Sequence, residues 1–286
     1  MGLFRAILRV LARLPLAWLH RAGAWLGWII YWSAPGYAAR LRDNISISGI
    51  CTDPAARIKL TRRAVAEAGK SVAELPKLWF GPDEQVSGLV TCNTWAVVEE
   101  ARRAARGILF LTPHLGCFEI SAAYGAQRLP LTVMYRPPKL RWLEPVMLEG
   151  RTRWNARLAP ATLAGVRTLL KALKRGEAVG LLPDQAPGAG EGTWAPFFGR
   201  PAYTMTLATR LQRSTGAAVI MAFAERLARG GYELHLEAVP TDGFDEAALN
   251  RAIEAVIRRC PEQYLWSYNR YKVPAGVEPP SGSVVA

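Results

Sequence analysis

Short apolar runs alternate with amphipathic segments through most of the chain. Apolar runs bounded by turn residues predict buried strands at 107–112, 131–135, 178–182, 217–224 and 232–239. Amphipathic segments predict helices at 53–79, 93–106, 119–127, 138–155, 162–175, 204–213 and 244–259. The segment 183–201 holds four prolines and four glycines and is predicted to be a loop. This alternation indicates an α/β sandwich with a mixed, partly parallel sheet flanked by helices.

The first 40 residues differ in composition from the rest. Leu, Ile, Ala, Trp and Gly predominate, and Arg5, Arg9 and Arg13 recur every four residues, as on one helix face. Residues 22–39 approach the length of about 20 apolar residues that a membrane span needs, although Pro35 lies near their end. Trp and Tyr, which favour membrane interfaces, are frequent here. We therefore expect N-terminal hydrophobic helices that enter or lie on a membrane, with basic residues facing anionic head groups. A buried helix pair in a soluble domain is the alternative.

The chain is long enough for one large or two small domains. Half of its residues are hydrophobic, which allows a large buried core. The predicted division is a membrane-associating helical segment at 1–40, a main domain at 41–273 and a loose tail at 274–286. The four cysteines are widely spaced and match no zinc pattern. Free thiols in a reducing compartment, and no metal site, are therefore expected.

The formal net charge is +13, and the sequence pI is about 10.0. Such an excess implies an anionic partner: a phospholipid surface, a phosphorylated substrate or a nucleic acid. Single-stranded nucleic-acid binding would favour aromatic residues on strands, interleaved with Lys and Arg. Here the aromatic residues crowd instead into the first 37 residues, the predicted loop and the tail. We therefore expect no nucleic-acid partner.

One histidine stands directly after a predicted buried strand. His114 follows the apolar run 107–111 and precedes Glu119 by five positions. A histidine beside a carboxylate is a general base with a fixed tautomer. On a continuous helix the two side chains would point about 140° apart. They can meet only if the chain turns after His114, where Pro113 and Gly116 favour a turn, and if a helix begins near Glu119. The alternative is a loop histidine with a structural role.

Arg136 and Asp184 follow the ends of predicted strands, where α/β folds place ligand-binding groups. Arg136 follows the strand at 131–135. A third candidate, Arg151, comes later in the chain than Arg136 and does not follow a predicted strand. Either guanidinium suits a phosphate group, although a single arginine is commonly a solvated surface group. Asp184 follows the strand at 178–182 and is predicted either as a site residue or as the cap of the next turn.

Other patterns are interpreted as structural. The glycine-rich segment 188–192 is not followed by a predicted helix, so a phosphate-binding loop is not expected. No Gly-x-Ser-x-Gly element is present in the sequence. Cys117 is interpreted as a small buried hydrophobic residue rather than a nucleophile. His20 and His235 lack an acidic partner at a useful spacing and are predicted to be structural.

In the order of its motifs the chain resembles the bacterial lipid A late acyltransferases, the lauroyl and myristoyl transferase family of the lysophospholipid acyltransferase superfamily. The matching elements are a His-x4-Asp/Glu box at His114 and Glu119, Tyr-Arg-Pro at 135–137, Gly-Arg at 150–151, Pro-Asp-Gln at 183–185, Pro-Phe-Phe-Gly at 196–199 and Pro-Glu-Gln-Tyr-Leu-Trp at 261–266. Each element is loose alone, but six in this order, spread over most of the chain, are specific. Departures after Gln185 and after Trp266 concern the acceptor rather than the reaction class.

The resemblance implies a lysophospholipid-acyltransferase-like sandwich and an acyltransferase role for the main domain. It implies transfer of an acyl chain from acyl carrier protein to a hydroxyl of an anionic, phosphorylated glycolipid, a lipid A precursor, at the cytoplasmic face of the bacterial inner membrane. No cofactor or metal is required. His114 would be the general base, and Glu119 would orient it. Backbone N–H groups near Gly116 are expected to bind the oxyanion.

The same resemblance suggests roles for the remaining candidates. Arg136 and Arg151 are expected to bind acceptor phosphates, and Asp184 to pair with Arg151. Three alternatives remain open on the residues alone. The acceptor is another lipid, such as a lysophospholipid, an ornithine lipid or a mannosylated phosphoinositide; the enzyme is a thioesterase that uses water; or the chain is a non-catalytic basic protein.

Overall fold

A central mixed sheet organises the chain. The computed structural model describes residues 2–104 and 106–280. Within them, seven strands form one sheet in the order β1-β9-β8-β2-β5-β3-β4, and all neighbours are parallel except the antiparallel pair β8–β9. The strands are β1 Val90–Thr91, β2 Ile108–Leu111, β3 Leu131–Tyr135, β4 Arg157–Pro160, β5 Ala178–Leu181, β8 Ala218–Arg226 and β9 Tyr232–Val239. The predicted α/β fold with a mixed, partly parallel sheet is confirmed.

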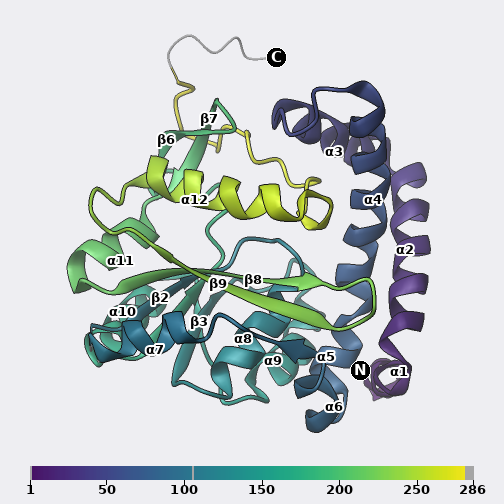
Figure 1. Cartoon of the computed structure of the whole chain (residues 1–286), viewed down its shortest axis with the longest axis horizontal. Helices are drawn as coiled ribbons and strands as arrows, with labels where there is room; N and C mark the ends of the chain where they lie inside the picture. Colours follow the sequence, from purple (N-terminus) through teal and green to yellow (C-terminus); the bar gives the residue numbers. More distant parts are fainter. Residues whose placement is uncertain (1, 105, 281–286) are drawn as a thin grey trace.

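Helices cover both faces of this sheet. α12 lies on one face and α7 and α8 lie on the other (Figure 1), and each side has its own hydrophobic core. Successive residues of β2 point to opposite cores, because side chains alternate along a strand: Leu109 and Leu111 to one, Ile108 and Phe110 to the other. The helices are α1 Gly2–Arg13, α2 Leu16–Ser33, α3 Pro35–Ile47, α4 Pro54–Ala73, α5 Leu75–Phe80, α6 Asp83–Ser87, α7 Ala96–Arg103, α8 Phe118–Ala126, α9 Glu144–Thr152, α10 Leu163–Lys174, α11 Leu207–Thr215 and α12 Glu246–Arg259, with short 3₁₀ helices at Arg141–Leu143 and Pro261–Gln263.

In the N-terminal part of the chain, α2 packs along α4 (Figure 1). Glycines permit the close approach: a Cβ on Gly69 would lie 1.9 Å from the carbonyl oxygen of Gly23, and a Cβ on Gly27 would lie 2.2 Å from that of Val65. Among the helices of residues 2–104 and 106–280, none is both long and apolar enough to cross a membrane. The expectation of N-terminal hydrophobic helices that enter a membrane is therefore not supported.

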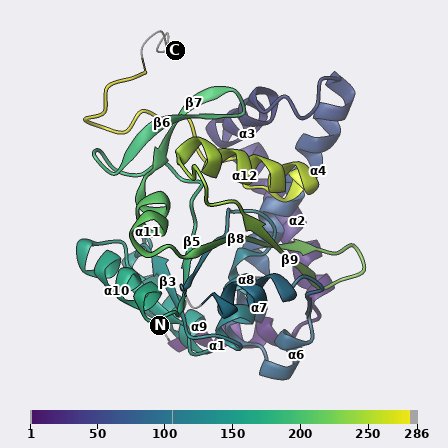
Figure 2. The ribbon, with the colours of Figure 1, turned by 60° about the vertical axis from the view of Figure 1, so that its left-hand side comes forward.

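The prediction of a loop at 183–201 is wrong in its second half. There β6 Gly192–Phe197 and β7 Arg200–Met205 form an antiparallel hairpin, which Figure 2 shows beyond α12, away from the main sheet. Phe198 and Gly199 form its two-residue turn with φ of 47° and 73°, as a type I′ turn requires. Prolines are tolerated in this hairpin because each strand of a two-stranded sheet has an edge with no ladder to break.

Most other predicted elements are confirmed, with shifted ends. The sequence pattern does not predict the short strands β1 and β4, and the helix expected from 204 begins at Leu207 because β7 continues to Met205. Asp53 caps α4 as expected, accepting a hydrogen bond from the N–H of Ala56 at 2.7 Å. In the predicted tail, residues 281–286 lie outside the described residues. The domain boundaries at 40 and 273 stay predictions.

Candidate active site

His114 and Asp184 follow the ends of two neighbouring parallel strands. β2 and β5 pair in register up to Leu111 and Leu181, so the residues three positions beyond each strand lie side by side. Nδ1 of His114 is 2.8 Å from Oδ1 of Asp184, and the backbone N–H of His114 donates to Oδ2 at 2.9 Å. Asp184 thus holds both the ring and the backbone of His114.

The partners of His114 determine its tautomer. Burial alone would raise the pKa of Asp184, but attraction to His114 and hydrogen bonds from its ring and backbone outweigh burial and lower this pKa. An ionised carboxylate only accepts hydrogen bonds, so Nδ1 of His114 carries the proton. Nε2 is left as the basic nitrogen, and the side-chain amide nitrogen of Gln185 lies 3.2 Å from it. Gln185 carries no signal of its own as a site residue in the sequence, although the Pro-Asp-Gln element contains it.

The predicted pairing of His114 with Glu119 is wrong, as is that of Asp184 with Arg151. Nε of Arg151, on α9, donates to the two carboxylate oxygens of Glu119 at 3.0 and 3.1 Å. Nε1 of Trp79, on α5, donates to the same carboxylate at 3.2 Å. The chain does turn after His114, but the first turn of α8 directs Glu119 towards α5 and α9. Within the described residues no hydrogen bond joins His114 to Glu119, and the two acids have exchanged their expected partners.

Gly116 makes possible the turn at residues 113–117, which we call the His114 turn. Its φ is +59°, and a Cβ there would lie 2.0 Å from the carbonyl oxygen of Ala224 on β8. The backbone N–H groups at this point are already used: Gly116 donates to the carbonyl of Gln263 at 3.1 Å, and Cys117 donates to that of Ala224 at 2.7 Å. The expectation that N–H groups near Gly116 bind an oxyanion is therefore wrong for these two.

The C-terminal element at 261–266 braces the His114 turn. The N–H of Leu265 donates to the carbonyl of His114 at 3.0 Å. The side chain of Gln263 accepts from the backbone N–H of Arg226 at 2.8 Å and donates to its carbonyl at 3.0 Å. The sequence marks this element only through the family resemblance. In the structure it joins the end of β8 to the turn that carries His114.

A buried charge cluster supports the same turn. Arg226, at the end of β8, donates to the carbonyl of Gly116 at 2.8 Å and to the two carboxylate oxygens of Glu74 at 2.6 and 2.9 Å. Tyr232 donates to Glu74 at 2.9 Å, and Nε2 of His20 lies 3.0 Å from it. His20 thus has an acidic partner 54 residues away, which spacing along the sequence does not reveal. We call Glu74, Arg226, Tyr232 and His20 the Arg226 cluster.

The cluster holds its charges in the protein interior. Burial alone would raise the pKa of Glu74, but Arg226 and His20 outweigh it and lower the pKa to about 2. Burial likewise opposes the charge of Arg226, yet Glu74 raises its pKa above the ordinary value. Both groups are therefore ionised at neutral pH. The cluster joins α2, the junction of α4 and α5, and the pair β8–β9 to the His114 turn.

The remaining candidates fall into different environments. Arg151 is bound to Glu119, whereas Arg136 follows β3, is exposed, and makes no ion pair within the described residues. Cys117 is buried, and burial raises the pKa of its thiol, which agrees with its interpretation as a small buried hydrophobic residue. Across residues 2–104 and 106–280, no group of three or more His, Cys, Asp or Glu side chains is placed to bind a metal ion.

Two adjoining cavities lie on the α8 side of the sheet. The first is lined mostly by apolar side chains, together with the hydroxyls of Thr112 and Ser121; we call it the apolar cavity. The second, which we call the charged cavity, is lined in part by the ion pair of Glu119 and Arg151. Phe118 lines both, and its ring packs against that of His114 with centroids 5.1 Å apart. Phe118 therefore lies between the imidazole and both cavities.

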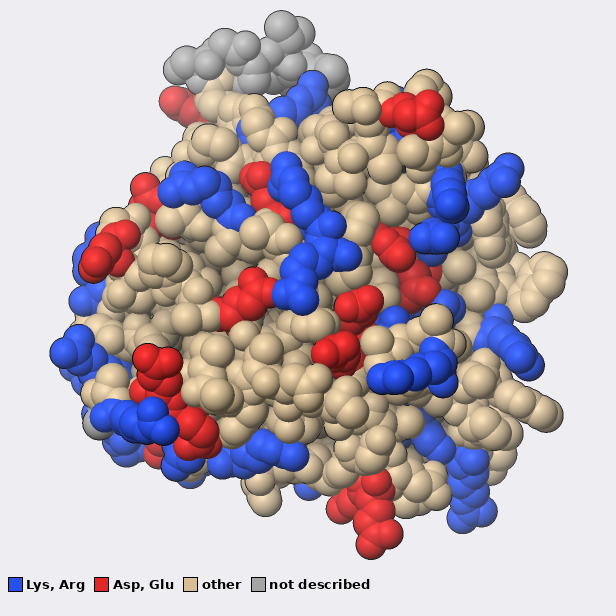
Figure 3. All heavy atoms as spheres, viewed as in Figure 1, with Lys and Arg blue, Asp and Glu red and all other residues tan. Residues whose placement is uncertain are grey.

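Basic side chains are scattered over the face shown in Figure 3, and acidic side chains lie between them. On this face the positive charge does not form one continuous groove of the kind that follows a nucleic-acid backbone.

Comparisons with known proteins agree on one family. The family model for the bacterial lipid A biosynthesis acyltransferases matches residues 2–273. The chain is 32% identical over 223 residues to the lipid A biosynthesis palmitoleoyltransferase of Escherichia coli strain K12, covering 76% of this chain and 72% of that protein. It is 26% identical over 283 residues to the lipid A biosynthesis lauroyltransferase of the same strain, covering 95% and 91%. It is 24% identical over 258 residues to the lipid A biosynthesis myristoyltransferase, covering 85% and 79%.

Proposed function

This chain belongs to the bacterial lipid A biosynthesis acyltransferase family, and we propose that it transfers a fatty acyl chain from acyl carrier protein to a hydroxyl of a lipid A precursor. Family membership supports acyl transfer in the late acylation of lipid A. The observation that carries the proposal for this site is the hydrogen bond of His114 to Asp184. It leaves a basic imidazole nitrogen near an apolar cavity, which suits an alcohol acceptor and a lipid donor.

In the proposed mechanism His114 is the general base. Nε2 takes the proton from the acceptor hydroxyl as its oxygen attacks the thioester carbonyl, and Asp184 stabilises the resulting imidazolium. The C–O bond forms, the C–S bond breaks, and the proton passes from His114 to the carrier thiol. The acceptor hydroxyl displaces the amide of Gln185, which lies 3.2 Å from Nε2. No cofactor takes part in these steps.

The developing oxyanion needs hydrogen-bond donors other than Gly116. The first N–H groups of a helix have no partner within the helix, so we assign this role to the backbone N–H groups of Phe118 and Glu119 at the start of α8. Glu119 and Arg151 then act together, by holding the first turn of α8 against α9. Arg136, exposed after β3, is assigned to an acceptor phosphate.

Replacement of the two acids by their amides separates their roles. We expect Asp184→Asn to lower kcat by about 100-fold, because a neutral amide neither selects the Nδ1–H tautomer nor stabilises the imidazolium. We expect Glu119→Gln to change kcat much less and to act mainly through KM. Steady-state kinetics with an acylated carrier protein measures both. A severe loss in Glu119→Gln beside near-normal turnover in Asp184→Asn would restore Glu119 as the orienting acid.

The function itself is tested with purified protein, carrier proteins charged with different acyl chains, and a tetra-acylated lipid A precursor. Mass spectrometry is expected to show one added acyl chain on the precursor. Parallel reactions replace the precursor with a lysophospholipid or with no lipid. Transfer only to the lysophospholipid would assign another acceptor. Hydrolysis that no lipid acceptor accelerates would identify a thioesterase.

The N-terminal helices carry exposed apolar side chains that suit a membrane surface. On α2, Trp18, Trp25 and Trp32 are each more than half exposed, and their spacing places them on one side of the helix. A helix with an exposed apolar stripe and nearby arginines lies in the interface rather than across it. We propose that α1 and α2 hold the enzyme on the anionic cytoplasmic face of the inner membrane.

We expect the triple change of Trp18, Trp25 and Trp32 to serine to weaken binding to anionic phospholipid vesicles by more than about tenfold, because burying one large apolar side chain stabilises by about 1.5–3 kcal/mol. Vesicle sedimentation measures the bound fraction. The control is Leu163→Ser, which changes an even more exposed apolar residue on α10, far from α2 in Figure 1. Equal losses in both proteins would rule out a surface specific to α2.

A further inference from the structure

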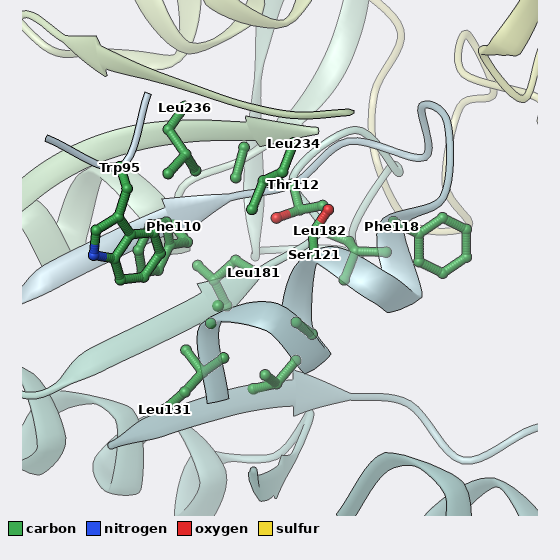
Figure 4. A pocket seen from close by; sticks show the side chains of 15 residues that line it. Trp95, Phe110, Thr112, Phe118, Ser121, Leu131, Leu181, Leu182, Leu234 and Leu236 are labelled. Atoms are coloured by element: carbon green, nitrogen blue, oxygen red, sulfur yellow. The ribbon is translucent and has the colours of Figure 1, made fainter. Parts of the chain in front are cut away.

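The apolar cavity extends from the neighbourhood of His114 into the core between α8 and the sheet. Phe118, which contacts the His114 ring, lies at one end of the lining and Trp95 at the other (Figure 4). Thr112 and Leu182, two positions before His114 and Asp184, also line it. The cavity is therefore continuous with the strand ends that carry the site.

Two glycines line this cavity at positions where neither the backbone conformation nor a close contact requires a glycine. A Cβ on Gly180 would be 3.4 Å from Cγ2 of Val133, and one on Gly125 would be 3.5 Å from Cδ2 of Leu131, both ordinary contacts. Neither glycine has a positive φ. At Gly116, by contrast, a Cβ would overlap a carbonyl oxygen. The missing side chains at 125 and 180 thus serve the volume of the cavity rather than the path of the chain.

A polar group in the lining marks where a ligand carries polarity. Ser121 on α8 is 8% exposed, and its Oγ is a buried side-chain atom for which the described residues provide no hydrogen-bond partner. In Figure 4 its hydroxyl lies near that of Thr112, in the middle of the cavity wall. A buried hydroxyl without a partner is unfavourable unless a ligand atom satisfies it. Hydrocarbon along the apolar walls and an oxygen atom near Ser121 would fit this lining.

We propose that the apolar cavity is the subsite for the transferred acyl chain, and that Gly125 and Gly180 determine the longest chain it accepts. This inference rests on the proposed acyl transfer. The thioester carbonyl lies beside His114 and the hydroxyls of Thr112 and Ser121. From there the chain runs away from Phe118 and ends among Gly125, Gly180 and Trp95. The charged cavity is excluded for the chain because Glu119 and Arg151 line it, and hydrocarbon would desolvate that ion pair.

Chain-length profiles test the subsite. Wild type, Gly180→Ala, Gly180→Val and Trp95→Ala are each given carrier proteins bearing decanoyl, lauroyl, myristoyl and palmitoyl groups, with the lipid A precursor as acceptor. The quantity compared is the ratio of kcat/KM for the longest chain that wild type uses well to kcat/KM for the next shorter chain. We expect Gly180→Val to lower this ratio by about tenfold or more, because one methylene group in a hydrophobic pocket changes kcat/KM by about that much. We expect Gly180→Ala to lower this ratio by less. We expect Trp95→Ala to move the chain-length preference towards longer chains.

The control is Gly36→Ala, where a Cβ meets nothing within 4 Å and the cavity is not involved; its profile matches wild type. Opposite shifts in Gly180→Val and Trp95→Ala are not produced by instability, which lowers all chain lengths together. Unchanged profiles in folded variants of an active enzyme overturn the subsite and leave the proposed function intact. Absence of transfer from every donor by wild type overturns the proposed function instead. If Gly180→Val does not fold, Gly180→Ala and Trp95→Ala decide the matter.

Discussion

Replacing His114 with alanine is expected to reduce acyl transfer by about 10²–10⁴-fold, the usual contribution of a positioned general base. The change removes Nε2, the one ring nitrogen left basic by the hydrogen bond between Nδ1 and Asp184. The thioester still binds and remains electrophilic, but the acceptor hydroxyl must lose its proton to water. Initial rates with acylated carrier protein and a lipid A precursor measure the loss, and thermal unfolding shows whether the variant is folded.

His235→Ala is the matched control. His235 also contacts a carboxylate, that of Glu225 at 3.2 Å, but it lies on β9 and not at the strand ends that carry the site. We expect it to retain wild-type turnover. Hydrolysis of the thioester without an acceptor is expected to decrease in His114→Ala as well, because water needs the same base. Wild-type transfer by His114→Ala would end the general-base proposal and would leave the family assignment untouched.

The sequence predicts the positions of the site residues better than their partners. His114 and Asp184 are each recognisable as polar residues at the end of an apolar strand. Their contact depends on β2 and β5 being neighbours, although 70 residues separate the two side chains. Sequence spacing favours Glu119, five positions from His114, because local pairs are the ones that spacing reveals. Strand order in a sheet is set by tertiary packing, which a single sequence does not display.

The same limit applies elsewhere in the fold. The prolines and glycines of the hairpin β6–β7 predict a loop. They fit a hairpin only because its two strands pair with no third strand and its turn has positive φ angles, and neither fact can be read from the sequence. The Arg226 cluster is equally invisible, since Glu74 and Arg226 are 152 residues apart. By contrast, the strands β2, β3, β5, β8 and β9 and the capped start of α4 depend on local patterns, and these predictions are confirmed.

Replacing Arg226 with methionine is expected to destabilise the protein by about 3–5 kcal/mol, the usual cost of leaving one member of a buried ion pair without its partner. Both side chains are almost fully buried, at 3% exposure for Arg226 and 2% for Glu74. The change also removes the hydrogen bond to the carbonyl of Gly116, so turnover is expected to fall even at temperatures where the variant is folded. Urea unfolding and rate measurements on the folded variant check the two effects separately.

A double variant and a pH series distinguish this ion pair from ordinary loss of packing. Combining Arg226→Met with Glu74→Gln removes the stranded charge and is expected to recover part of the stability lost in Arg226→Met, a coupling that a double-mutant cycle measures. In wild type the pKa of Glu74 is about 2 against an ordinary 4.5. Ionised Glu74 therefore stabilises the fold above about pH 4.5, and this contribution is lost as the pH falls towards 2.

The pH dependence should have the opposite sign once Arg226 is gone. In Arg226→Met, burial raises the pKa of Glu74 instead of being outweighed, so the penalty is present at neutral pH and decreases as acidification protonates the carboxylate. The stability difference between wild type and variant should therefore narrow from neutral to mildly acidic pH. A difference that stays constant with pH would show that Arg226 stabilises by packing alone, and an unaltered turnover in the folded variant would show that the His114 turn does not depend on it.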